Sequence, residues 1–241
     1  MGGLGVILAQ PELKIDWTRM PTYNTIMAVA AGAGLLLVVA FGRRLLRGDS
    51  LENVDGWALA FGAIGGILTV MGLHMSLTWP LAGQGFPYHN IIFGEPSVAF
   101  GVLLLAVAFY LWKRWAMVTV ASDRRKAAAR IAGPVSVFVL GMGLACLAIA
   151  AASLTYTLFA APPQEPIAGA FGHMKVLQSA FVAGLYVLVG VGAVLFPFAL
   201  RARGGPLANV AGVCWGISGV VFLLFGVLNY FMHLGLIVNT M

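Results

Sequence analysis

The chain of 241 residues is far more apolar than a soluble domain, with 61% hydrophobic and 9% charged residues, against roughly 25% charged residues in an average soluble protein. This composition excludes a soluble enzyme and predicts an integral membrane protein. The net charge of +6 is divided among short loops, which speaks against a nucleic-acid-binding surface.

Six stretches are apolar over about 20 residues, enough to cross a bilayer core about 30 Å thick. They cover residues 23–41, 56–79, 94–112, 134–160, 170–199 and 209–238. Before them, residues 1–22 lack the basic region of a cleaved signal peptide and fit an interfacial helix on the outer surface. We therefore expect one domain over residues 1–241, an all-α six-helix transmembrane bundle whose first membrane helix directs insertion.

The basic residues predict the orientation of the bundle. Of the 14 Lys and Arg residues, 11 follow the first, third and fifth stretches: Arg43, Arg44, Arg47, Lys113, Arg114, Arg124, Arg125, Lys126, Arg130, Arg201 and Arg203. Loops rich in Lys and Arg stay in the cytoplasm. Both termini and the loops 80–93 and 161–169 are then outside, as in a multi-pass protein of the plasma membrane.

An internal repeat organises the chain. The octapeptide "SLTWPLAG" at 76–83 is echoed by "SLTYTLFA" at 153–160, which predicts two parallel helical-hairpin repeats over 56–115 and 133–200, followed by the final helix at 209–238. The alignment sets Glu95 of "FGEP" opposite His173 of "FGHM". In the second stretch Gly62 and Gly66 have the small-xxx-small spacing of close helix packing.

Ionisable residues gather at the predicted outer side of the membrane, where they are candidate functional groups. The predicted metal ligands are His74, His173, His233 and Glu95; His89 and Met71 are further candidate ligands, and Asn229, Tyr230 and Lys175 are their candidate neighbours. His74 has no counterpart in the second repeat, where Ala151 stands, which favours a ligand role. Cys146 and Cys214 lie within apolar helices and are expected to pack as small hydrophobic residues.

Imidazole and carboxylate ligands suit copper, iron or zinc. We therefore expect a membrane metalloprotein with a redox function, of the oxidase or monooxygenase type or as a subunit of a respiratory complex. The alternatives are an electron carrier with haem b between two axial histidines, a zinc-dependent membrane hydrolase, and a transporter or structural subunit without a metal. Whether the protein is an enzyme stays open. The expected partners are the lipid bilayer and other membrane subunits or a second copy of the chain, without nucleic acid.

The segments "GLHMSLTWP", "FGEP" and "FGHMK" also carry a family resemblance. Together with the chain length and the apolar helices, they make the chain similar to a bacterial and archaeal family of multi-pass integral membrane proteins, a domain of unknown function. The resemblance covers most of the chain. It implies a membrane bundle and brings no activity with it.

Overall fold

The computed structural model describes residues 15–49, 53–81, 86–114 and 123–241, and in these ranges the regular structure is entirely helical. Six described helices are long and apolar enough to cross a membrane: α1 (Asn24–Arg47), α2 (Val54–Leu77), α3 (Glu95–Arg114), α6 (Ser136–Tyr156), α7 (Lys175–Arg201) and α8 (Pro206–Thr240). The π-helix η1 (Asn90–Gly94) leads directly into α3. The predicted class, an all-α membrane bundle, is confirmed.

The described parts of the loops contain two shorter helices: α5 (Arg124–Ala132) before α6, and the 3-10 helix η2 (Ala168–Phe171) before α7. The main departure from the predicted bounds is at α1, which runs beyond residue 41 to Arg47. Basic side chains in a last turn interact favourably with the negative end of the helix dipole. The arginines that mark the membrane edge in the sequence therefore continue the helix instead of ending it.

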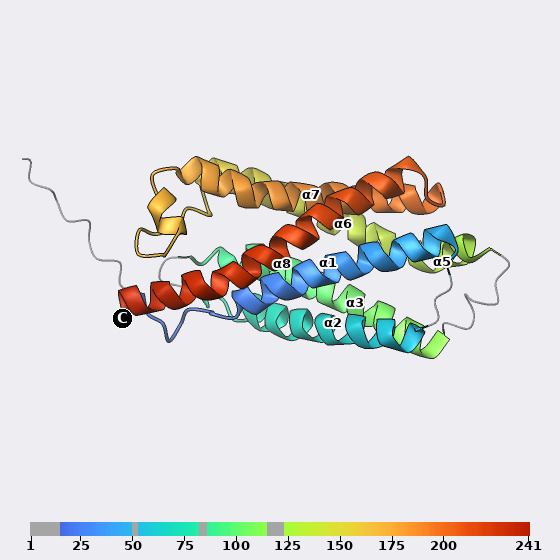
Figure 1. The fold of residues 1–241 in the computed structure, drawn as a ribbon, viewed down its shortest axis with the longest axis horizontal. Coiled ribbons are helices and arrows are strands. Elements are labelled where there is room, and N and C mark those ends of the chain that lie inside the picture. Colours follow the sequence, from blue (N-terminus) through green and yellow to red (C-terminus); the bar gives the residue numbers. More distant parts are fainter. Residues whose placement is uncertain (1–14, 50–52, 82–85, 115–122) are drawn as a thin grey trace, which may run out of the picture.

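The helices pack in three pairs: α2 with α3, α6 with α7, and α1 with α8 (Figure 1). Helix α8 crosses the bundle diagonally. Its 35 residues make it about 52 Å long at 1.5 Å per residue, more than a bilayer core needs, and a long helix accommodates this by tilting. The tilt brings the beginning of α8 against α7, where Trp215 donates a 3.1 Å hydrogen bond to the Val189 carbonyl. The later turns of α8 pack against α1.

Glycines allow the helices of each pair to approach closely. A Cβ on Gly65 of α2 would lie 2.9 Å from the Gly101 carbonyl of α3, and one on Gly143 of α6 would lie 3.0 Å from the Gly190 carbonyl of α7. The predicted contact through Gly62 and Gly66 holds for Gly62, where a Cβ would lie 3.7 Å from the Ala108 Cβ of α3, and is wrong for Gly66. A Cβ on Gly66 would meet nothing within 4 Å, because Gly65, and not its neighbour, lies on the face that α2 turns toward α3.

Both hairpins have a serine near the end of their first helix that donates to the preceding turn. Ser76 bonds the Gly72 carbonyl at 2.8 Å, and Ser153 bonds the Ile149 carbonyl at 2.7 Å. These are the serines of the two matching octapeptides. The repeat relation between the α2–α3 and α6–α7 hairpins stays a prediction.

The described part of the N-terminal segment, residues 15–22, forms turns, so the predicted interfacial helix is wrong there. Asp16 accepts hydrogen bonds from the Thr18 amide at 3.1 Å and from its hydroxyl at 2.5 Å, a local turn that competes with a helix. The indole of Trp17 donates to the hydroxyl of Thr240, at the end of α8, at 3.2 Å. Residues 1–14 lie outside the described ranges.

The bundle has two chemically different ends. At one end α2 and α8 finish and α3 and α7 begin, and all four histidines, His74, His89, His173 and His233, lie there; we call it the histidine end, on the left in Figure 1. The opposite end, with Arg43, Arg47, Arg125 and Arg203, is the arginine end.

Candidate functional site

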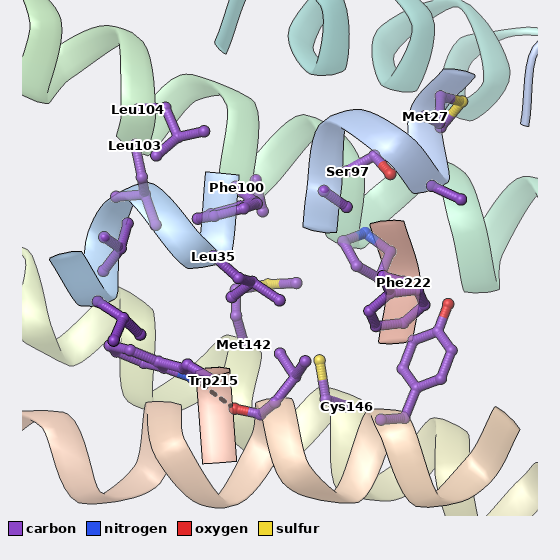
Figure 2. A pocket seen from close by; sticks show the side chains of 18 of the residues that line it. Met27, Leu35, Ser97, Phe100, Leu103, Leu104, Met142, Cys146, Trp215 and Phe222 are labelled. Atoms are coloured by element: carbon purple, nitrogen blue, oxygen red, sulfur yellow. Dashed lines mark hydrogen bonds between the residues drawn. The ribbon is translucent and has the colours of Figure 1, made fainter. Parts of the chain in front are cut away.

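A cavity of about 1720 Å³ lies between α1, α3, α6, α7 and α8. Its middle part is lined by apolar side chains from all five helices, among them Leu35, Phe100, Met142 and Phe222 (Figure 2). The cavity exists because α3 and α6 meet at few points, while α8 leans from one pair of helices to the other. Its volume exceeds the roughly 300–1,000 Å³ of a typical small-molecule pocket.

The cavity extends to the arginine end of the bundle. Arg43 and Arg47 of α1, Arg125 of α5 and Arg203 of the α7–α8 loop contribute to its lining there. Arg203 pairs with Asp123 at 3.8 Å, and about half of each side chain is exposed. Exposed ion pairs of this kind contribute little to stability, so this end is a solvated cationic rim.

At the histidine end, three ionisable side chains line the same cavity: His89 from the loop before η1, Glu165 from the α6–α7 loop, and His233 from α8. The His233 Nε2 and Glu165 Oε1 atoms are 3.9 Å apart, and the side chains are only 24% and 11% exposed. This separation is longer than a hydrogen bond. The amide side chains that accompany them in the lining are Asn24, Gln178 and Asn229.

The loop that carries Glu165 is anchored to α7 and α8. Gln178 of α7 donates to the Ala168 carbonyl at 2.7 Å and accepts from the Ala161 amide at 2.9 Å. Asn239 of α8 donates to the Gln164 carbonyl, the residue before Glu165, at 2.8 Å. Bonds at several points along the loop fix its backbone, so Glu165 is held in the lining by tertiary contacts.

His89 is held by the turn between α2 and η1. The side-chain amide of the next residue, Asn90, donates to the Met75 and Thr78 carbonyls at the end of α2. The imidazole lies between two phenylalanine rings, stacked on Phe86 at 5.0 Å between centroids and tilted against Phe93 at 4.9 Å. No hydrogen bond to this imidazole is found among the described residues.

Contacts between the two hairpins join them at the histidine end. Tyr88 donates to the Leu158 carbonyl at the end of α6, at 3.0 Å, and Tyr186 of α7 donates to the Ile92 carbonyl of η1. The rings of Phe93 and Phe159 meet at 6.0 Å. These contacts hold His89 and Glu165, which come from different hairpins, at one end of one cavity.

Burial shifts the pKa values of His89 and Glu165, the two ionisable cavity residues that lie in loops. Burial, with a smaller effect of a charge on His233, lowers the pKa of His89 to about 3. Burial raises the pKa of Glu165 to about 7. At neutral pH the imidazole is therefore uncharged, and burial favours the protonated, neutral form of the carboxyl group more than water does.

The four predicted metal ligands have different surroundings. The Nδ1 atom of His74 is 2.7 Å from the Tyr23 hydroxyl, in a hydrogen bond between α2 and the start of α1. His173 and Glu95 are exposed, and His233 lines the cavity. Within the described ranges, no group of three or more His, Cys, Asp or Glu side chains is placed to hold a metal ion, so the metal site stays a prediction.

The other residues predicted for the site, the further candidate ligands and their neighbours, also lie in different surroundings. His89 and Asn229 line the cavity. Met71 packs against the hydrophobic core between α1, α2 and α3, whereas Tyr230 and Lys175 are exposed.

Glu165 was not among the residues predicted from the sequence. It stands in "PPQEP", where a carboxylate precedes a proline as Glu95 does in "GEP". The available signal was that a scarce acidic residue lies in a loop at the same end as four histidines, but nothing in the local pattern reveals its burial.

Comparison with known proteins places the chain in a family. The model of the family described as "Protein of unknown function (DUF981)" matches residues 20–235. The chain belongs to this family. The match includes α1 to α7, most of α8 and the cavity residues His89, Glu165 and His233, and it confirms the membership expected from the sequence. No curated protein and no solved structure matches the chain.

Proposed function

We propose that the protein binds a long-chain membrane lipid in the cavity between its helices. The observation that carries the proposal is the cavity, which combines an apolar middle with polar residues at both ends of the bundle. Because it runs along the membrane-spanning helices, an extended chain fits it better than a compact solute. Lipid tails are as apolar as the lining, so the polar ends must provide the selectivity.

The distribution of charge favours a lipid over an ion or a polar solute. The charged residues in the described lining, Arg43, Arg47, Arg125, Glu165 and Arg203, all lie at the two ends. Pathways for ions and polar solutes depend on ionisable residues within the membrane. The apolar middle of this cavity would instead oppose the passage of a charged solute.

Filling the middle of the cavity tests the proposal. Leu103 of α3 lines the cavity, whereas its neighbour Val102 is 49% exposed on the outside of the bundle. We expect Leu103→Trp to expel most of the lipid that co-purifies with the wild-type protein in mild detergent, and Val102→Trp to retain it. Lipid extraction and mass spectrometry of the purified proteins measure the ratio of each lipid to protein.

A lipid that remains after washing, near one per protein molecule, and that is lost only from Leu103→Trp supports the proposal. Equal retention by both variants, or no defined lipid in the wild-type protein, contradicts it. Thermal unfolding of each variant provides the control that both proteins are folded.

The metal-centred redox function remains a separate prediction, with copper, iron, zinc or haem b as the group to be found. Two of its candidate ligands, His89 and His233, line the cavity together with Glu165. This observation supports the prediction of a metal-centred redox function. Elemental analysis and the visible absorption spectrum of the purified protein test it. A stoichiometric metal or a Soret band that is lost on replacing both histidines would support it.

The orientation is also part of the proposal. With the arginine end in the cytoplasm, the histidine end lies at the outer surface of the plasma membrane. A lipid bound in the cavity would then have its ends near the two faces of the bilayer.

A further inference from the structure

We infer that the histidine end of the cavity binds the ring of a quinone-type lipid, a flat ring with carbonyl or hydroxyl oxygens on its edges. This inference rests on the proposed lipid-binding function and adds the class of the head group. The juxtaposition that carries it is that of His89, Glu165 and His233 with aromatic side chains at the histidine end of a long apolar cavity.

The hydrogen-bonding groups fit a ring oxygen. The His233 Nε2 and Glu165 Oε1 atoms are 3.9 Å apart, so one ligand oxygen can lie at about 2.8 Å from both of them, within hydrogen-bond distance of each. Asn24, at the start of α1, also lines the cavity, and its Oδ1 atom is buried without a hydrogen-bond partner. Buried polar atoms are normally satisfied, so this amide is a candidate partner for a ligand hydroxyl.

Aromatic side chains provide faces for a flat ring. Phe93 and Tyr186 line the cavity with Phe159 between them, and the Phe159 and Tyr186 rings are stacked at 6.2 Å. Phe222 of α8 meets Tyr186 edge to face at 6.3 Å. Aromatic rings prefer offset-stacked and edge-to-face neighbours, and a quinone ring has this shape.

The charge at this end selects a neutral head group. Burial keeps the imidazole of His89 uncharged, since its pKa falls to about 3, and favours the protonated form of Glu165, whose pKa rises to about 7. The described lining offers a phosphate no Lys or Arg side chain at this end, because its arginines all lie at the opposite end. Quinone and quinol oxygens are neutral acceptors and donors that match neutral imidazole, carboxyl and amide groups.

The rest of the cavity fits the chain of such a lipid. Apolar side chains that line the middle of the cavity include Leu35, Leu104 and Met142 (Figure 2). Continuing from the histidine end, an isoprenoid or alkyl chain would extend along these apolar residues toward the arginine end. One ligand thus uses both the polar end and the apolar middle.

A pair of ligands that differ only in the ring oxygens tests the inference. We expect the full-length protein in lipid nanodiscs to bind decyl-benzoquinone at least about tenfold more tightly than decylbenzene, since one unsatisfied buried hydrogen-bonding group costs about that factor. Titration calorimetry, with empty nanodiscs as the reference for partition into lipid, measures both affinities.

Two variants test whether the side chains at the histidine end cause the preference for the quinone over decylbenzene. His233→Phe keeps a ring but removes its nitrogens, and we expect it to reduce the preference for the quinone about tenfold. His173→Ala is the matched control, because His173 is exposed at the same end and is expected to leave the preference unchanged. The comparison of the two ligands on the wild-type protein decides the inference even if His233→Phe does not fold.

Equal affinities for the two ligands overturn the inference, as does a stoichiometric metal or haem held by His89 and His233. If a defined lipid still co-purifies and is lost in Leu103→Trp, the lipid-binding function stands and only the head group is wrong. If no lipid co-purifies and neither ligand binds, both proposals fail.

Discussion

Glu165 and His89 show how single residues respond to burial at the histidine end. For Glu165, a pKa raised from 4.5 to about 7 means that the folded protein holds a proton that the unfolded chain releases. Its contribution to stability is therefore complete below about pH 4.5 and is lost as the pH rises through 7. For His89, whose pKa is lowered to about 3, the sign is opposite: its contribution is present above about pH 6.5 and is lost as the pH falls.

Because His89 is present in both proteins and its effect cancels, the difference between wild type and Glu165→Gln reports on Glu165. We expect the variant to gain stability relative to wild type by about 3 kcal/mol between pH 4.5 and pH 8, from a shift of about 2.5 pKa units at 1.36 kcal/mol each. Thermal unfolding in detergent across this range measures the difference. A difference that is independent of pH would show that Glu165 does not titrate in this range.

Glu95 and Glu165 mark the limit of sequence reasoning for single residues. Both carboxylates precede a proline at the histidine end, but only Glu95 is predicted as a ligand, because the repeat alignment sets it opposite His173 and it begins a membrane helix. In the structure Glu95 is exposed, whereas Glu165 is buried by the loop that Gln178 and Asn239 hold. This burial depends on hydrogen bonds between residues 10 and 75 positions apart in the chain, which no local pattern records.

At the scale of helices, the six spans could be predicted because each needs only a long apolar run, and the membrane imposes that length. The face that each helix turns toward its neighbour could be predicted less reliably than the span itself. A hydrophobic stretch that borders both lipid and protein shows little amphipathic pattern, so the sequence did not distinguish Gly65 from Gly66 as the residue that contacts α3.

Substitution of neighbouring glycines tests the helix contacts. We expect Gly65→Ala and Gly143→Ala each to cost about 1–3 kcal/mol, because the new methyl group would press on the backbone of the paired helix. The controls Gly66→Ala and Gly141→Ala face open space and are expected to be neutral or slightly stabilising, since alanine favours a helix over glycine. Thermal unfolding in detergent ranks the four variants; equal effects within each pair would contradict the packing.

At the scale of the whole molecule, the cavity results from the way the helix pairs are assembled. The α2–α3 and α6–α7 hairpins are each tightly packed, but α3 and α6 touch little, and contacts such as Tyr88 with Leu158 join the hairpins at the histidine end. The order of the helices around a bundle is not encoded in hydropathy. The sequence therefore predicted that polar groups gather at one side, but not which of them share a cavity.

The orientation of the molecule determines which side of the membrane the histidine end faces. Loops rich in Lys and Arg remain in the cytoplasm, so we expect His173→Cys to react with a membrane-impermeant maleimide on intact cells and Lys126→Cys to react only after permeabilisation. Both positions are exposed, and they lie at opposite ends of the bundle. The native Cys146 and Cys214 are buried, which keeps background labelling low. The reverse pattern would place the histidine end of the cavity in the cytoplasm and leave the lipid-binding proposal intact, because the cavity does not depend on orientation.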